Sequence, residues 1–245
     1  MTPRRLALIG YGKMGTQIEQ VALERGHQIV LRATAAEPAT DYALRDADVA
    51  LDFSSAAAVE QHVRMCATVG IPLIIGTTGW RDDQGFLSTA AERIGIVVGA
   101  NFSVGVAMMV RLAGQLAQML SPALGYQLHI HEVHHRAKRD HPSGTALLLA
   151  RTLGEHLPNQ AAIVTSPDAP PADAITISSA RVGSIVGVHT ILADSPADML
   201  EITHTAKSRR GFALGAVLAA EWIVGKRGLF DFSDVAFEVL AQASQ

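Results

Sequence analysis

LALIGYGKMG, residues 6–15, joins a short apolar run to a turn with three glycines. Apolar residues then recur at broadly helical spacing as far as Gly26, a residue type that commonly ends helices. The pattern predicts a strand, a glycine turn and a helix. In dinucleotide-binding folds such a turn lets the backbone approach a pyrophosphate, which the start of the helix stabilises. Any tight strand-to-helix turn also needs glycine, so the motif alone is a weak indication of nucleotide binding.

Strands and helices continue to alternate as far as residue 98. Apolar runs predict further strands at residues 28–33, 49–53, 71–75 and 94–98. Ser54 and Ser55 can cap a helix that runs through Val69 and ends at Gly70. This alternation predicts an α/β fold with a parallel sheet, whose ligands bind at the carboxyl ends of the strands. The segment GTTG, residues 76–79, follows one such end, where a ligand contact and an ordinary loop are equally good interpretations.

The later part of the chain has a different pattern. An amphipathic helix is predicted from Val104 to Leu120, ended by Ser121-Pro122. Strict alternation then predicts a half-buried strand, with Leu128 and Ile130 on one face. Further β-rich segments follow at residues 174–181, 184–192 and 199–205. Strands that follow one another after helices predict an α+β domain with an antiparallel or mixed sheet.

Proton-transfer groups and positive charge are concentrated in EVHHRAKRDHPSGTA, residues 132–146. The cationic and titratable groups, set against only two carboxylates, are Arg136, Lys138, Arg139, His134, His135 and His141. Ser143 is the expected N-cap of the next helix, so the backbone N–H groups of Gly144 and Thr145 lack partners within the helix and favour an anion. Paired histidines beside a lysine indicate a proton donor with an anion clamp, and a carboxylate substrate fits this charge balance.

Two other interpretations of this stretch are open. The spacing of His129, His131, His134 and His135 could form a metal site, although the interleaved arginine and lysine would repel a cation, and we expect no metal. A solvated basic loop before an ordinary helix is the stronger alternative.

The composition narrows the class of protein. The chain has 245 residues, of which 49% are hydrophobic and only 5% aromatic, so an aliphatic core is expected. A formal net charge of −3 argues against nucleic acid or an anionic membrane as a partner. Cys66 is the only cysteine, which excludes an intrachain disulfide. The first apolar run is too short for a signal peptide and no stretch is suited to span a bilayer, so a cytoplasmic protein is expected.

The motifs together resemble those of one family. The run Glu-x-His-His-x-x-Lys-x-Asp-x-Pro-Ser-Gly-Thr-Ala at residues 132–146 is similar to the signature of the 4-hydroxy-tetrahydrodipicolinate reductases, also called dihydrodipicolinate reductases, of bacterial lysine and diaminopimelate synthesis. Further motifs occur in the family's order at residues 10–15, 76–79, 100–105 and 201–204. The resemblance covers nearly the whole chain, and this set of motifs is far more specific than the glycine turn.

The resemblance implies a reductase that uses NADPH or NADH to reduce a cyclic dicarboxylate imine. The implied fold is a Rossmann-like dinucleotide-binding domain followed by an α+β domain for substrate binding and oligomerisation. The first domain is expected at residues 1–103 with 211–245 and the second at residues 104–210. A homotetramer is the assembly that the resemblance implies.

The resemblance also implies roles for individual residues. His134 and Lys138 are the expected proton donors, and Lys138 with the helix start also holds carboxylate oxygens. The expected substrate-binding residues are His135, Ser143, Gly144 and Thr145. The expected cofactor-binding residues are Gly10, Tyr11, Gly12, Lys13, Met14, Gly15, Thr34, Gly76, Thr77, Thr78, Gly99, Ala100, Asn101 and Phe102. Arg181 is a candidate to hold a second carboxylate.

One position departs from the family pattern. Family members carry an acidic residue at the end of the second strand, where a dinucleotide fold holds the ribose hydroxyls, and here that position is Thr34. Arg32 and Lys13 are the nearby cations. The choice between NADH and NADPH is open at this point, but the missing acidic group predicts that NADPH is used at least as well as NADH.

Two rival functions remain. A sugar or inositol dehydrogenase would share the nucleotide-binding half, but those enzymes usually carry a Glu-Lys-Pro tripeptide that this chain lacks. A sensor protein that binds the nucleotide without catalysis is the rival from another class.

Overall fold

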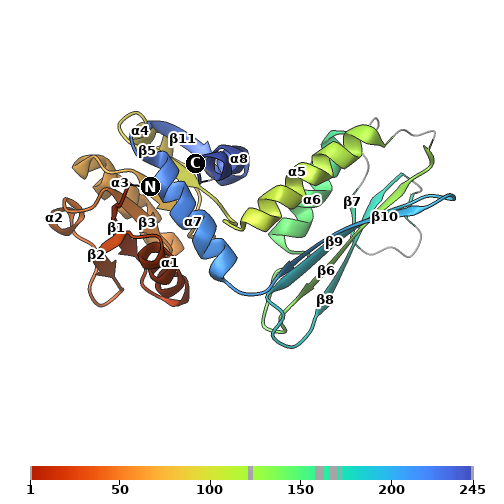
Figure 1. Cartoon of the computed structure of the whole chain (residues 1–245), viewed down its shortest axis with the longest axis horizontal. Helices are drawn as coiled ribbons and strands as arrows, with labels where there is room; N and C mark the ends of the chain where they lie inside the picture. Colours follow the sequence, from red (N-terminus) through yellow and green to blue (C-terminus); the bar gives the residue numbers. More distant parts are fainter. Residues whose placement is uncertain (1, 121–123, 158–162, 166–169, 172, 244–245) are drawn as a thin grey trace. The chain divides into compact units, whose positions relative to one another are not determined.

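The computed structural model describes residues 2–120, 124–157, 163–165, 170–171 and 173–243 (Figure 1). These residues divide into two compact units. The first unit runs to Val104 and resumes at Arg209, and the second unit runs from Gly105 to Ser208. Both divisions lie close to the domain boundaries expected from the sequence.

In the described part of the chain, the first unit is built on a six-stranded parallel sheet in the order β11-β5-β4-β3-β1-β2. Its strands are β1 (Arg5–Ile9), β2 (Gln28–Ala33), β3 (Val49–Asp52), β4 (Leu73–Ile75), β5 (Gly95–Val98) and β11 (Gly228–Asp231). Its helices are α1 (Lys13–Glu24), α2 (Asp41–Leu44), α3 (Val59–Val69), α4 (Phe86–Ala91), α7 (Arg210–Ile223) and α8 (Phe232–Ala243). The expected Rossmann-like α/β fold is confirmed.

Both faces of this sheet are covered, which is why its strands are nearly continuous apolar runs. Ala7 in β1 belongs to a core shared with α2, α3 and α4, while its neighbour Leu8 is buried on the opposite face. α7 lies against β3, β4 and β5. Its close approach requires Gly215, because a Cβ there would lie 1.9 Å from the carbonyl oxygen of Phe102.

Most of the predicted elements are present in the first unit, but one predicted helix cap is wrong. β2 covers the predicted residues, and α3 ends at Gly70, whose φ of 86° suits glycine. Ser55 precedes a short 3₁₀ turn without a capping hydrogen bond, and Ser54 Oγ donates instead to the Asp52 carboxylate at 2.6 Å. The sequence pattern did not predict α2, α4, β11 or α8, and β4 begins at Leu73, later than predicted.

The second unit, as far as the structure describes it, is a five-stranded mixed sheet in the order β10-β9-β6-β8-β7. Its elements are α5 (Val104–Met119), β6 (Gln127–His134), α6 (Gly144–Glu155), β7 (Ile163–Val164), β8 (Ile175–Arg181), β9 (Gly187–Asp194) and β10 (Met199–Ala206). β6 pairs parallel with β8 and antiparallel with β9, so the expected mixed sheet is confirmed. Figure 1 shows α5 and α6 on the same face of the sheet, and their apolar residues share one core with it. The predicted helix stop at Ser121-Pro122 lies outside the described residues.

β6 runs from the apolar core of the second unit to a buried polar site at its carboxyl end. Leu128 and Ile130 are buried, as predicted, and the next two residues on that face, Glu132 and His134, are buried as well. The inward face of one strand therefore changes from apolar to ionisable at its carboxyl end. Among the described residues of both units, no helix combines the length and apolar character needed to cross a bilayer.

Candidate functional site

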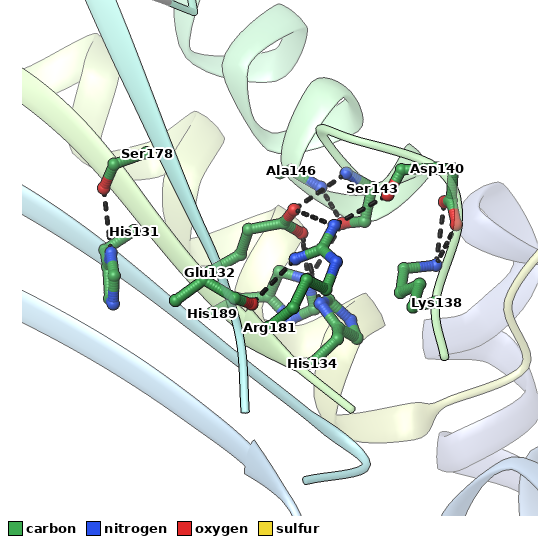
Figure 2. Close-up of polar contacts among 11 residues, drawn as sticks. His131, Glu132, His134, Lys138, Asp140, Ser143, Ala146, Ser178, Arg181 and His189 are labelled. Carbon is green, nitrogen blue, oxygen red and sulfur yellow. Dashed lines mark hydrogen bonds and ion pairs between the residues drawn. The ribbon is translucent and has the colours of Figure 1, made fainter. Parts of the chain in front are cut away.

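A buried carboxylate, Glu132, lies at the centre of the polar cluster in the second unit (Figure 2). Its Oε1 accepts hydrogen bonds from the backbone N–H of Ser143 and from Nη2 of Arg181, both at 3.0 Å. Its Oε2 lies 3.4 Å from Nδ1 of His134 and 3.7 Å from Nε2 of His189. Burial opposes ionisation, but the hydrogen bonds from Ser143 and Arg181 outweigh it and lower the pKa of Glu132 to about 2. The carboxylate is therefore charged at neutral pH.

Two histidine rings pack beside this carboxylate. His134 ends β6, and His189 in β9 lies directly opposite Glu132 in the strand register. The ring centroids are 5.0 Å apart in an edge-to-face arrangement. Burial is the largest influence on the pKa of His134 and lowers it; Glu132 opposes that shift and Lys138 adds to it. Burial likewise lowers the pKa of His189 to about 4. With these neighbours both rings are mainly neutral at pH 7.

The helix that follows, α6, begins at the predicted residue. Ser143 is its N-cap, and Ser143 Oγ accepts a hydrogen bond from the backbone N–H of Ala146 at 3.2 Å. Gly144 and Thr145 form the first turn. A Cβ at Gly144 would have no atom within 4 Å, so the helix start is open around this residue. An open helix start of this kind favours an anion.

Lys138 lies on the loop between β6 and α6, where its Nζ is 2.7 Å from each carboxylate oxygen of Asp140. Burial raises the pKa of Asp140, but the Lys138 ammonium and the backbone N–H of Gly144 lower it overall. Asp140 therefore faces two of the groups that were expected to hold a substrate carboxylate. His135 is half-buried on the same loop, and its carbonyl oxygen accepts the backbone N–H of Lys138 at 3.1 Å.

The guanidinium of Arg181 donates its hydrogen bonds to groups of the protein itself. Besides its contact with Glu132, Nη2 donates to the carbonyl oxygen of Asp140 at 2.6 Å, and Nη1 donates to that of Ala180 at 2.8 Å. These contacts argue against the hypothesis that Arg181 holds a second substrate carboxylate. Instead, Arg181 stabilises the charged carboxylate of Glu132 and fixes the loop that carries Lys138.

The sequence pattern gave His189 no role and did not connect Arg181 with Glu132. The alternation that begins at Leu128 was sufficient to place Glu132 on the inward face, but it did not show which groups the carboxylate would meet. His189 and Arg181 lie on other strands and reach Glu132 only through sheet pairing. No local sequence signal relates those positions.

The histidine-rich segment does not form a single cluster. Because side chains alternate along β6, His129 and His131 lie on the opposite face from His134. Nδ1 of His129 is 2.7 Å from the hydroxyl of Thr176, and Nδ1 of His131 is 2.8 Å from that of Ser178. The metal site that the linear spacing suggested is therefore divided between two faces of the sheet.

Within the described residues a different set, Glu132, His134 and His189, brings potential metal ligands within 4.8 Å of one another. The guanidinium of Arg181 already binds Glu132, and Lys138 adds a second positive charge near His134. Both charges oppose a metal cation at this place. That the protein needs no metal stays a prediction.

The glycine turn of the first unit begins with a backbone conformation that favours glycine. Gly10 has a φ of 89°, and a Cβ at this position would lie 2.4 Å from the carbonyl oxygen of Phe53. A Cβ at Gly15 would lie 2.9 Å from the carbonyl oxygen of Gly10. These contacts bring β1, β3 and α1 close together.

The start of α1 is open. Gly12 is the N-cap, and no atom lies within 4 Å of the place where its Cβ would be. Lys13 and Met14 form the first turn, with Lys13 exposed and Met14 half-buried. The N-terminal end of α1 can therefore receive a phosphate group.

The end of β2 carries an ion pair that the sequence did not predict. Arg32 donates through Nε to Oε1 of Glu19 in α1 at 3.0 Å, and the same carboxylate accepts the hydroxyl of Tyr11. Thr34 Oγ1 accepts the backbone N–H of Glu37 at 3.1 Å. An acidic side chain is thus present near the end of β2, but it comes from α1.

Thr77 belongs to a buried network around Asp52. Oδ1 of Asp52 accepts hydrogen bonds from Thr77 Oγ1 at 2.9 Å and from the backbone N–H of Ser54 at 2.9 Å, and Oδ2 lies 2.8 Å from Nδ1 of His62. Burial raises the pKa of Asp52, but His62 and Ser54 lower it overall. The side chain of Thr77 therefore stabilises the loop and points into the protein.

The remaining expected cofactor residues differ in exposure. Gly76 makes room for the ring of Phe53, whose Cε1 would lie 2.1 Å from a Cβ, and Gly99 makes room for that of Phe102. The ring of Phe102 is buried against Phe232, with centroids 4.6 Å apart, so this side chain belongs to the core. On the loops that these residues support, Thr78 and Ala100 are exposed and Asn101 is half-buried.

Comparison with known proteins identifies two matching family models. Residues 4–102 match the model described as dihydrodipicolinate reductase, N-terminus, and residues 105–236 match the model described as dihydrodipicolinate reductase, C-terminus. The 4-hydroxy-tetrahydrodipicolinate reductase of Christiangramia forsetii is 39% identical, over 94% of this chain and 96% of the relative. The enzyme of the same name from Neisseria meningitidis serogroup B is 38% identical, over 96% and 98%.

Solved structures show the same fold. The dipicolinate-bound dihydrodipicolinate reductase from Paenisporosarcina sp. TG-14 matches with a TM-score of 0.77 at 23% identity, covering 96% of this chain and all of that one. The amine dehydrogenase from Mycobacterium smegmatis matches with a TM-score of 0.61 at 11% identity, covering 95% and 96%. At these identities the likeness concerns the fold alone.

Proposed function

We propose, because the chain belongs to the dihydrodipicolinate reductase family, that it catalyses the reduction of 4-hydroxy-tetrahydrodipicolinate to tetrahydrodipicolinate in lysine and diaminopimelate synthesis. The observation that carries this proposal is the junction of β6 and α6. There a histidine and an anion-favouring helix start both lie against the buried carboxylate of Glu132.

The first unit fits a pyridine nucleotide. The turn at Gly10 lies at the carboxyl end of β1, and no atom lies within 4 Å of the place where a Cβ of Gly12 would be, at the start of α1. Lys13 is exposed beside this start and can add a contact to a phosphate. When bound, NADPH or NADH supplies the hydride. The residues that would line it on the neighbouring loops include Thr78, Ala100 and Asn101, which are at least partly exposed.

The second unit supplies the contacts for a dicarboxylate. Backbone N–H groups at Gly144 and Thr145 and the ammonium of Lys138 provide positive potential for one carboxylate group. A bound carboxylate would take over the interactions of Lys138 with Asp140, an ion pair whose aspartate is 55% exposed. Exposed ion pairs are worth at most about 1 kcal/mol, so this exchange costs little.

Reduction of the imine also requires a proton, and we assign the role of proton donor to His134. Its pKa is lowered by burial and by the positive charge of Lys138. A substrate that brings two negative charges close to the ring reverses part of this effect and favours the imidazolium. Substrate binding would thus help to charge its own proton donor, while Glu132 stabilises the charged ring.

The proposal is tested by following NADPH oxidation spectroscopically with purified protein, pyruvate, aspartate semialdehyde and a dihydrodipicolinate-forming synthase. We expect oxidation that depends on all five components. Oxidation that continues without the synthase would indicate another carbonyl substrate. A protein that binds NADPH in a calorimeter but never oxidises it under these conditions would instead be a nucleotide sensor, and the proposal would be wrong.

The assembly and the location are part of the same proposal. A homotetramer follows from the resemblance, with the face of the second sheet opposite α5 and α6 as the proposed surface for association. Light scattering on the purified protein measures its mass directly. We also propose a cytoplasmic location, which fractionation of the producing cells would check.

A further inference from the structure

Two buried atoms face each other at the centre of the site without forming a hydrogen bond. Oε2 of Glu132 and Nδ1 of His134 are 3.4 Å apart, and neither has a hydrogen-bond partner among the described residues. The side chain of Glu132 is fully buried and that of His134 is nearly so, so water does not readily satisfy either atom. A proton on Nδ1 would give both atoms their missing partner.

The opposite nitrogen of the ring is also placed by the protein. A Cβ at Gly187 would lie 3.1 Å from Nε2 of His134, so glycine at this position of β9 leaves room for that side of the ring. With Nδ1 directed at Glu132, Nε2 is the nitrogen that can deliver a proton to a substrate. The carboxylate therefore selects which nitrogen of His134 acts.

The second oxygen of Glu132 is bound to the anion site. Oε1 accepts the backbone N–H of Ser143, the N-cap of α6, at 3.0 Å. The same oxygen accepts Nη2 of Arg181, which also binds the carbonyl oxygen of Asp140 and so fixes the loop between β6 and α6. One carboxylate thus contacts the histidine through Oε2 and the helix start through Oε1.

We infer that Glu132 is a positioning residue that holds the proton donor His134 and the anion-binding start of α6 in register, one through each carboxylate oxygen. This inference rests on the proposed function, because it takes His134 as the donor. Arg181 serves as the partner that keeps the carboxylate charged and fixed.

The two roles can be separated with Glu132→Gln. The amide oxygen of glutamine can still accept the N–H groups of Ser143 and Arg181, so the helix start is retained. The amide NH₂ cannot accept a proton from Nδ1 of His134. In Glu132→Ala both contacts are lost. Glu201→Gln, an exposed glutamate on β10 of the same sheet, is the matched control.

We expect Glu132→Gln to lower kcat by about 10- to 100-fold, as the loss of a group that orients a functional histidine typically does. The KM for the imine and the Kd for pyridine-2,6-dicarboxylate should change by less than about threefold, because the anion site is preserved. Glu132→Ala should also weaken binding of the dicarboxylate. Equal loss of kcat and of binding in Glu132→Gln would mean that the residue serves only to hold the fold together.

A second measurement tests the contact itself and does not depend on catalysis. The titration of the His134 ring is followed by NMR in the unmodified protein and in Glu132→Gln, with His134→Asn used to assign the resonance. The charged groups that face the ring are Glu132, Lys138, Arg181, Asp140 and, when protonated, His189. Removal of the nearest negative charge should lower the pKa of His134, and Glu201→Gln should leave it unchanged.

An unchanged pKa of His134 in folded Glu132→Gln would overturn the inference. If the unmodified protein reduces no imine but the pKa of His134 still falls, the contact is real and the proposed function is the part that fails. Circular dichroism and thermal unfolding establish that each variant is folded before either result is interpreted.

Discussion

Arg32 and Glu19 form an ion pair beside the glycine turn, with Arg32 Nε 3.0 Å from Glu19 Oε1. The guanidinium also lies 6.0 Å from the ring centroid of Tyr11, whose hydroxyl donates to the same carboxylate. The hydrogen bond between the two side chains is the main cause of two pKa shifts: it raises the pKa of Arg32 and lowers the pKa of Glu19. The positive charge nearest the end of β2 is therefore largely balanced by an acidic neighbour.

This ion pair leads to a prediction about the cofactor. Glu19→Gln should leave Arg32 available to the 2′-phosphate of NADPH and raise the ratio of kcat/KM for NADPH over NADH by roughly two- to fivefold, since an exposed pair is worth up to about 1 kcal/mol. Thr34→Asp should shift the ratio towards NADH. Glu60→Gln, which breaks an exposed ion pair with Arg64 on α3, is the control. Steady-state kinetics with both nucleotides measure all four proteins, and a ratio that Glu19→Gln leaves unchanged would exclude Arg32 from cofactor choice.

The unmodified enzyme should use NADPH at least as well as NADH, because Thr34 brings no negative charge to the ribose. The kcat/KM values for the two nucleotides provide the comparison. A strong preference for NADH would show that Glu19 or Glu37 takes the place of the missing acidic residue.

His134→Ala should lower kcat by about 10²- to 10⁴-fold with a small change in KM, because general acid catalysis acts in the transition state. In the unmodified enzyme kcat/KM should fall as pH rises, beginning below the usual range of histidine because the pKa of His134 is lowered. The fall in kcat should come at higher pH, because bound carboxylates stabilise the imidazolium. Superimposable profiles for the two constants would contradict substrate-assisted protonation.

Lys138→Ala should raise the KM for the imine and lower kcat, because a fixed positive charge near the substrate helps in the ground state and in the transition state. A hydrogen bond to a charged group is worth about 1.5–3 kcal/mol, which corresponds to at least about a tenfold loss in kcat/KM. Arg139→Ala, an exposed residue one position further along the loop, is the control for charge alone. Unchanged kinetics for Lys138→Ala would remove it from the site.

Asp140→Asn should tighten binding of pyridine-2,6-dicarboxylate by roughly two- to fivefold, since the substrate carboxylate no longer competes for Lys138 and an exposed ion pair is worth at most about 1 kcal/mol. Isothermal titration calorimetry measures the Kd. The effect should be smaller when Lys138 is already alanine, because only the backbone N–H of Gly144 then remains for Asp140 to occupy. Weaker binding by Asp140→Asn would show that the aspartate holds Lys138 in place for the ligand.

Asp52→Asn should lower the free energy of unfolding by about 1–3 kcal/mol, because the hydrogen bonds from Ser54 and His62 no longer go to a charged carboxylate. The pKa of Asp52 is lowered in the folded protein, so its contribution is present above the unfolded value, near 4, and is lost as pH falls through the folded pKa. Urea unfolding at pH 7 and at acidic pH measures both effects. Asp48→Asn, which breaks the exposed pair with Arg5, should cost less than about 1 kcal/mol. Similar losses for the two variants would mean that the buried network contributes no more than a surface contact.

Features that depend on a few neighbouring residues were predicted well. The alternation of β6, the N-cap at Ser143 and the helix ends at Gly26 and Gly70 are each determined by local backbone geometry and by which side chains must leave water. The family motifs also identified the fold and the class of reaction, because each motif is a short run of neighbouring residues. Ser54 was wrong as a cap because its hydroxyl donates to the carboxylate of Asp52, two residues earlier, which belongs to a buried network with Thr77.

The site itself depends on strand pairing. Arg181 is 49 positions from Glu132 in the chain, and only the pairing of β6 with β8 brings its guanidinium to the carboxylate. In the same way, the pairing of β6 with β9 brings His189 to the other carboxylate oxygen, Oε2. Sequence patterns determine which residues form a strand and which face is buried. They do not determine which residues of other strands a buried side chain will contact. The charge states of Glu132 and His134 depend on those partners, so only the tertiary structure decided them.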